Sequence, residues 1–420
     1  MPVNLKLIPA PAIKPRPPIW WVWLLLLVFM LLGGMADAIL SNLSRTEINS
    51  QEFWTSALGL PSLLWLILAA LRVAWYKGQL GTARSRDKER DRLLHREIQR
   101  GQRYLNVFGI SLHSALREPE DTDGAKQWEA LRGKVKALKT QPSWKSHEGI
   151  RHSRLALADG EDTGQMLGRG LKKTLEELSI VLSSLPLDTP VSLLLESNSS
   201  LPESQLEEIW QKSWDASQIR QSAIRLDERG LSVVDKWLDD LRNAHSLLMI
   251  IALQVRPEHP KGSAENIVGL LLGGNQVSQD LKPLARLHRP EMMHHTEADD
   301  FQYALKQSME WVPIAAGEVK SGFLVGVNPA WHMAIATGLQ AIQSPINVGQ
   351  DIHDLGKTLG YPGPAAPWVA IACAVEACHR SDSQLIVSGN NHDNVPLWVT
   401  MVTPAEKQQG QAAAFNPKNR

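Results

Sequence analysis

Two long apolar stretches near the N-terminus constrain the fold of this chain most. Residues 19–40 read IWWVWLLLLVFMLLGGMADAIL, and residues 54–76 read WTSALGLPSLLWLILAALRVAWY. Each stretch holds a single charged residue near its far end, Asp37 in the first and Arg72 in the second. A helix of about 20 apolar residues crosses the hydrocarbon core of a bilayer. The pair therefore predicts a transmembrane helical hairpin over residues 19–76. A cleaved signal peptide, the alternative for the first stretch, has a shorter apolar region.

Basic residues are unevenly placed around these stretches. Lys6, Lys14 and Arg16 precede the first one, and no acid accompanies them. The connecting loop, residues 41–53, has one base and two acids. The region after the second stretch is rich in bases, namely Lys77, Arg84, Arg86, Lys88, Arg90, Arg92, Arg96, Arg100 and Arg103. Since cytoplasmic flanks carry the excess of Lys and Arg, we expect both termini in the cytoplasm, with residues 1–18 as a cytoplasmic segment.

Charge also limits what the rest of the chain can bind. Acids alternate with bases over residues 77–103, which predicts a solvated helical stalk. The whole chain has 44 basic and 44 acidic residues, and this balance argues against a nucleic-acid-binding protein. The last segment, residues 405–420, has no apolar periodicity and is predicted to be disordered. A soluble body over residues 104–404 remains.

Short apolar runs alternate with helical patterns in this body, which predicts an α/β fold. The predicted strands are residues 104–111, 190–196, 247–253, 266–272, 322–327, 383–388 and 397–402. The predicted helices are residues 123–139, 168–184, 202–213, 233–244, 300–311, 330–343 and 366–380.

Four features of the body resemble the thiolase-like fold of the ketoacyl synthases. Residues 262–265 (GSAE) lead into a predicted strand, and residues 351–366 (DIHDLGKTLGYPGPAA) are similar to a glycine-rich loop of that family. An alanine-rich helix at 366–380 and a closing strand pair at 383–388 and 397–402 follow. The resemblance implies a layered αβαβα body of two halves, about residues 104–254 and 255–404.

The chain departs from that family where the chemistry of condensation takes place. A condensing enzyme needs a thiolate at the N-terminus of a helix. The two cysteines, Cys373 and Cys378, instead lie within the apolar run WVAIACAVEACHR. Tyr361 stands where the family has an imidazole, and tyrosine titrates near pH 10. His332 is similar in position to the other imidazole. We therefore expect Lys357, Gly360, Tyr361 and His332 to be the degenerate remains of an active site.

Other reactive patterns are weak. The glycines of residues 349–358 do not have the spacing of a phosphate-binding loop, and Gly-x-Ser-x-Gly is absent from the sequence. Residues 288–300 contain several histidines and acids, which are good metal ligands. We expect instead that these residues form a loop whose acids cap the helix that follows. We therefore predict no cofactor and no metal.

The remaining features suggest a binding protein. Tryptophan is enriched at protein interfaces, and Trp210, Trp214 and Trp331 are candidate interface anchors. A tryptophan-rich membrane-proximal start joined to a thiolase-like body resembles the lipase-adaptor proteins of bacterial type VI secretion. That resemblance implies an inner-membrane adaptor, not an enzyme, that binds a lipase effector and helps to load it onto the secretion spike protein. A homodimer is possible by analogy with ketoacyl synthases. The alternatives are a membrane-associated acyl-transfer enzyme and a structural subunit of a secretion machine.

Overall fold

The computed structural model of this chain divides into two compact units, one of residues 4–98 and a body that begins at residue 99. The structure describes residues 5, 8–42, 50–146, 148–274, 276–277, 281–312, 314, 316–378, 382–391 and 395–405. The tail predicted to be disordered lies outside the described residues, apart from Ala405.

The N-terminal unit is helical. It contains α1 (Trp20–Asn42), the short α2 (Ser50–Trp54), a π-helical turn η2 (Thr55–Gly59) and the long α3 (Leu60–Gly101). Residues 20–41 and 55–101 are long and apolar enough to cross a membrane, and only 6% of the most apolar window of each is buried. A core helix of a soluble protein would be mostly buried, so these surfaces suit a lipid environment.

Small residues bring α1 close to the start of α3. A Cβ atom at Gly34 would clash with the Pro61 ring and the Ala57 carbonyl, so only glycine allows this approach. The indole nitrogen of Trp65 donates a hydrogen bond of 2.7 Å to the carbonyl of Trp23 on α1. Small residues and interhelical hydrogen bonds of this kind hold helices together in membranes. The predicted stalk continues α3 as a helix to Gly101.

The body is built on one mixed sheet in which a five-strand arrangement occurs twice. The strands of the first half are β1 (Tyr104–His113), β4 (Val191–Ser199), β5 (Ala223–Arg225), β6 (Leu247–Val255) and β7 (Asn266–Gly273). The five matching strands of the second half are β8 (Ala285–His288), β10 (Val319–Val325), β11 (Ile352–Asp354), β12 (Ser383–Ser388) and β13 (Trp398–Pro404). The two-residue β9 (Glu291–Met292) pairs with β13 outside this arrangement. The sheet order is β5-β4-β6-β7-β1 in one half and β11-β10-β12-β13-β8 in the other. Each half thus places its third, second, fourth, fifth and first strands side by side, and antiparallel pairing of β1 with β8 joins them.

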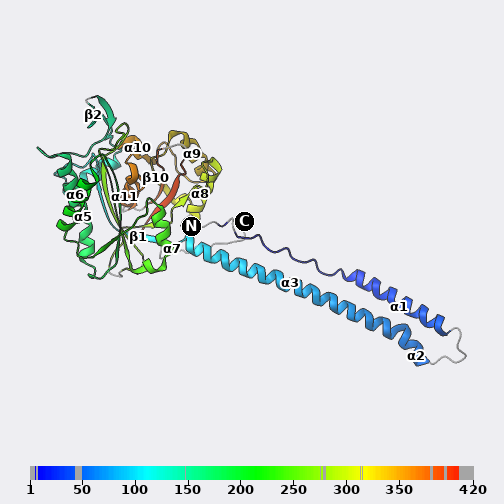
Figure 1. Ribbon diagram of the computed structural model, residues 1–420. Coiled ribbons are helices and arrows are strands. Elements are labelled where there is room, and N and C mark those ends of the chain that lie inside the picture. Colours follow the sequence, from blue (N-terminus) through cyan, green and yellow to red (C-terminus); the bar gives the residue numbers. More distant parts are fainter. Residues whose placement is uncertain are drawn as a thin grey trace. The chain divides into compact units, whose positions relative to one another are not determined.

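Helices repeat in the same order and complete the layers (Figure 1). The first half has α5 (Thr163–Ser183), α6 (Glu203–Ala216) and α7 (Ser232–Asp239), and the second has α8 (Ala298–Glu310), α9 (His332–Ala341) and α11 (Ala366–Cys378). One core lies between α5, α6 and the first half of the sheet, and another between α8, α9 and the second half. Between the two halves, α7 and α11 share a third core. This is the layered αβαβα arrangement.

Local signals explain why the elements begin where they do. Helix α5 starts with a capping box, in which Asp162 and Gln165 each bond the other's backbone amide. Its leucines at 171, 175, 178 and 182 are spaced by three or four residues and are all buried. This single apolar stripe fixes the face of α5 that packs on the sheet.

Three expectations need correction. Strand pairing ends the first half at β7, so the halves meet between residues 273 and 285 instead of at 254/255. The helix predicted over 123–139 is α4 (Ala125–Arg132), and Lys139 instead begins β2 (Lys139–Pro142), which pairs with β3 (Gly149–His152). Residues 355–358, part of the predicted glycine-rich loop, form a short helix, α10 (Leu355–Thr358).

Candidate functional site

The two sequence motifs that resemble ketoacyl synthases lie side by side in the structure. The amide of Tyr361 donates a hydrogen bond of 2.8 Å to the Gly262 carbonyl, and the amide of Ala264 donates one of 2.9 Å to the Tyr361 carbonyl. Gly360 has a φ of +102° and packs directly on the backbone of Ser263. The loop before α11 is therefore held to the turn before β7.

Neutral amides fill the space at the start of α11. The Gln254 side chain donates to the carbonyls of Ala264 and Tyr361 at 2.9 and 2.8 Å, and Asn198 donates to its oxygen at 2.8 Å. Gly363, with a φ of +60°, lies so close to Gln254 that a Cβ there would clash. Amides are neither nucleophiles nor general bases at neutral pH, and the hydrogen bonds of this network hold the loop before α11 against β4 and β6.

The four positions predicted as remnants of an active site separate into two pairs. Gly360 and Tyr361 belong to the loop described above, where burial raises the pKa of the tyrosine to about 12. Lys357 and His332 meet at Asp354 instead, with nitrogen–oxygen distances of 3.0 and 3.8 Å to the same carboxylate oxygen. Lys357 forms an ion pair with Asp354, and the His332 ring lies near the same carboxylate at the beginning of α9.

Both cysteines are sealed inside α11. Burial, with a smaller contribution from Glu376, raises the pKa of the Cys373 thiol to about 12. The Cys378 thiol is also buried, and it lies 3.3 Å from the carbonyl oxygens of Asp382 and Val402, to which it donates. The Cys373 thiol is therefore protonated at neutral pH, whereas nucleophilic attack by cysteine requires the deprotonated form.

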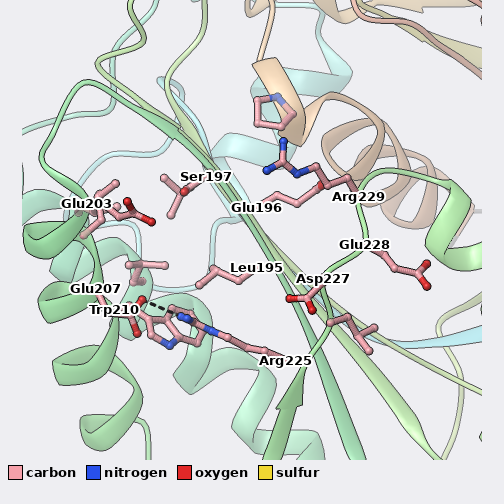
Figure 2. A pocket seen from close by; sticks show the side chains of 16 residues that line it. Leu195, Glu196, Ser197, Glu203, Glu207, Trp210, Arg225, Asp227, Glu228 and Arg229 are labelled. Atoms are coloured by element: carbon pink, nitrogen blue, oxygen red, sulfur yellow. Dashed lines mark hydrogen bonds and ion pairs between the residues drawn. The ribbon is translucent and has the colours of Figure 1, made fainter.

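A cleft of about 400 Å³ opens near the carboxyl ends of β4 and β5, beside α6 and the turn before α7 (Figure 2). Ligands of open α/β sheets bind at this end of the strands. Five carboxylates line it, those of Glu196, Glu203, Glu207, Asp227 and Glu228, together with the guanidinium groups of Arg225 and Arg229. Its apolar surface comes from Trp210, Pro364 and leucines at 167, 171, 195, 206, 226 and 253. We call this site the acidic cleft.

Only some of the charges in the acidic cleft are paired. Arg225 forms an ion pair of 3.0 Å with Glu207 and lies 5.9 Å from the center of the Trp210 ring. Glu228 pairs with Lys236 at 3.2 Å. Among the residues that the structure describes, the side chains of Glu203, Asp227 and Arg229 have no hydrogen-bond or ion-pair partner. In Figure 2 Asp227 points into the cleft, whereas Glu228 points away from it.

Glu196 links the acidic cleft to the helices between the two halves. One of its carboxylate oxygens accepts a hydrogen bond of 2.7 Å from the Gly230 amide, in the turn before α7, and the other accepts one of 2.6 Å from the Trp368 indole on α11. Its side chain is buried, with 7% of the residue exposed. Glu196 is therefore a structural acceptor that fixes the back of the cleft.

The three predicted interface anchors have different surroundings. Trp210 lines the acidic cleft, and the Trp214 ring lies 5.6 Å from it along α6. Trp331 is only 9% exposed and packs in the core beneath α8 and α9, so we correct its assignment to a core residue. The sequence did not reveal Glu203, Asp227 or Arg229 as site residues, because Glu203 begins α6 while the other two lie in the turn after β5, and the two segments form no motif.

The predicted cluster at residues 288–300 is divided among different partners. His288 is buried and shares a hydrogen bond of 3.0 Å with the Thr403 hydroxyl, while Glu291 accepts one from the Trp311 indole. Helix α8 begins after Glu297, whose side chain makes no capping hydrogen bond, so the predicted capping role is wrong there. In the part of the chain that the structure describes, no three metal-ligating side chains converge.

Comparison with known proteins identifies the fold. No protein-family model matches this sequence, and no curated protein matches it. The structure is similar to a PfaC keto synthase–chain length factor, with a TM-score of 0.52 and 12% identity over 72% of this chain and 43% of that one. It is also similar to the ishigamide ketosynthase/chain length factor, with a TM-score of 0.46 and 13% identity over 72% of this chain and 99% of that one. The similarity to the 3-oxoacyl-[acyl-carrier-protein] synthase III from Aquifex aeolicus VF5 has a TM-score of 0.42 and 11% identity over 71% of this chain and 99% of that one. The similarity to the PfaC keto synthase–chain length factor shows that the body has the thiolase-like fold of ketosynthases, as the sequence motifs predicted.

Proposed function

We propose that this chain is a membrane-anchored, non-catalytic adaptor that binds a partner protein through its thiolase-like body. The observation that carries the proposal is the burial of both thiols in α11, where the pKa of Cys373 is raised to about 12. A condensing enzyme forms a covalent acyl-thioester and requires a thiolate. A body of this fold without an accessible thiolate retains its shape and surfaces, which suit binding.

The N-terminal unit supports attachment to a membrane. Only 6% of the most apolar window of each of its two long helices is buried, and bases flank the helices on one side. We propose insertion in the bacterial inner membrane with both termini in the cytoplasm. Attachment to a membrane raises the concentration of a bound partner near other membrane proteins. Following the resemblance to type VI secretion adaptors, the proposed partners are a lipase effector and a secretion spike protein.

The test is recovery of partners from native membranes. The full chain, tagged and extracted in a mild uncharged detergent, should co-purify a lipase-type effector and a spike protein that mass spectrometry identifies. A parallel purification of an unrelated two-span membrane protein controls for nonspecific capture. If the full chain yields neither class of partner above that control, the adaptor proposal is wrong.

Acyl transfer is the second candidate function, because the fold is that of ketosynthases. A cerulenin-like electrophile distinguishes it from binding. An acyl-transfer enzyme with a cysteine nucleophile would be labelled at Cys373 or Cys378, and alanine at that position would abolish activity. A structural subunit of a secretion machine, the third candidate, would remain in the complex in cells that lack the effector. An adaptor would not.

A further inference from the structure

The acidic cleft points to the chemistry of the partner segment that it would hold. We infer that it binds an extended segment carrying a lysine or arginine next to apolar residues, with an acidic residue further along. This inference rests on the proposed function, because it assigns a site to the partner that the adaptor binds.

Two carboxylates that have no ion-pair partner within the protein indicate that the bound segment carries a positive charge. Glu203, on the first turn of α6, and Asp227, after β5, both line the acidic cleft without an ion-pair partner among the described residues. Glu207 is paired with Arg225 and Glu228 with Lys236, so the unpaired side chains are Glu203 and Asp227 against Arg229, an excess of negative charge in a chain that has no net charge. The local excess attracts a cation at this position specifically.

The apolar side chains that line the cleft between these charges indicate that the bound segment also carries apolar residues. Leu195, Leu206 and Trp210 line the same cleft, whose volume of about 400 Å³ is in the usual range for a ligand site. Long basic side chains bury their methylene stems on apolar surface while the charged end reaches a polar group. A lysine or arginine with an aliphatic neighbor would therefore fill both kinds of surface.

Arg229 would determine the orientation in which the segment binds. Its guanidinium has no partner among the described residues and lies in the cleft with the unpaired acids. A segment that is basic throughout would place a cation against it, which costs affinity. A base followed by an acid matches both signs, so fixed charges of opposite sign select a segment and orient it.

Peptide binding to the full chain in an uncharged detergent tests the inference. The probe is a fluorescein-labelled peptide, Gly-Lys-Leu-Leu-Glu-Leu-Gly. The control peptide has glutamine in place of lysine. We expect the lysine peptide to bind and the Glu203→Gln/Asp227→Asn protein to bind it about five- to tenfold more weakly, because both unpaired carboxylates of the cleft lose their charge. Fluorescence anisotropy measures both affinities. Glu120→Gln/Asp188→Asn, which removes two exposed acids outside the cleft, should leave the affinity unchanged.

Three results would overturn the inference. They are no saturable binding of the lysine peptide, equal binding of the glutamine peptide, and unchanged affinity in the Glu203→Gln/Asp227→Asn protein. A thermal melt of each variant separates lost binding from lost folding. Co-purification with the same variants separates this inference from the adaptor proposal. If the wild type and the cleft variant recover equal amounts of partner, the cleft is not the docking site. If the wild type recovers none, the adaptor proposal fails and the anisotropy measurement alone decides the chemistry of the cleft.

Discussion

The carboxylate of Glu196 on β4 accepts a hydrogen bond of 2.6 Å from the indole nitrogen of Trp368 on α11. Both residues are buried, and they belong to different halves of the body. The other oxygen of the same carboxylate holds the Gly230 amide before α7. One acid thus joins a strand of the first half to both helices of the central layer.

Removing the indole donor should destabilize the body. Trp368→Phe leaves one oxygen of a buried carboxylate without its partner and opens a small cavity, so we expect a loss of about 2–4 kcal/mol in the free energy of unfolding. Chemical denaturation followed by circular dichroism measures it. Trp214→Phe is the matched control, since Trp214 is only half-buried and its stability cost should be below about 1 kcal/mol. Equal losses in the two variants would contradict the assigned hydrogen bond.

The cysteines should be inert in the folded protein. Because burial raises the pKa of Cys373 to about 12, its thiol stays protonated at pH 8. Iodoacetamide should therefore modify neither cysteine in the native chain within the time that it modifies both in urea, as followed by mass spectrometry. Rapid modification of either cysteine in the native chain at pH 8 would show that the thiols of α11 are not buried.

Glu291 should make stability depend on pH. Burial, with a contribution from nearby Asp235, raises the pKa of this carboxyl from 4.5 to about 7. The folded state then binds a proton that the unfolded state has released between these values, so stability falls as pH rises from about 4.5 through 7. Glu291→Gln keeps an acceptor for the Trp311 indole but cannot titrate. Between pH 5 and pH 8 the wild type should lose on the order of 2–3 kcal/mol more than this variant, as measured by denaturation at both values. Parallel pH profiles would exclude this role for Glu291.

Asp239 should have the opposite dependence. Burial acts to raise its pKa, but hydrogen bonds from Arg100 and Arg289 outweigh it and lower the pKa to about 2. The stabilization is complete above the ordinary value of 3.8 and is lost as pH falls toward 2. Asp239→Asn should lower the free energy of unfolding at pH 7 and flatten its decline below pH 4. Arg242→Gln breaks only an exposed ion pair with Asp240. This variant should leave the free energy of unfolding at pH 7 and its decline below pH 4 nearly unchanged.

Gly34 should be required for the packing of α1 on the start of α3. Leucine at this position would clash with Pro61, whereas Gly33 faces open space and should tolerate leucine. A bifunctional maleimide should link Trp23→Cys to Trp65→Cys in otherwise unchanged chains. The yield should fall severalfold with Gly34→Leu and stay constant with Gly33→Leu. Equal yields would show that α1 does not pack in this way.

The buried strands and long helices could be predicted because each is a continuous apolar run or a single amphipathic stripe. Strand β12 has the predicted bounds, and β6 and β7 differ from them by only one or two residues at the C-terminal end. The strands that the sequence did not reveal, such as β5 and β11, have three residues each. Three residues form less than two periods of a strand pattern, so their pairing depends on neighbors already in place.

The acidic cleft could not be predicted as a unit. Trp210 was identified from its residue type, but Glu203 and Asp227 belong to segments separated by an entire helix and strand. Their presence in one cleft depends on the parallel pairing of β4 and β5, which only the folded sheet determines. The meeting of residues 262–265 with Tyr361 was likewise hidden, because it joins loops that are about a hundred residues apart.

The arrangement of α7 and α11 has a consequence for how the body can be divided. Each half contributes one helix to the same apolar layer, so neither half can bury its inner sheet face without the other. Fragments cut between residues 273 and 285 should aggregate when produced singly and regain solubility when produced together. We therefore expect the smallest piece that folds to contain both halves of the body.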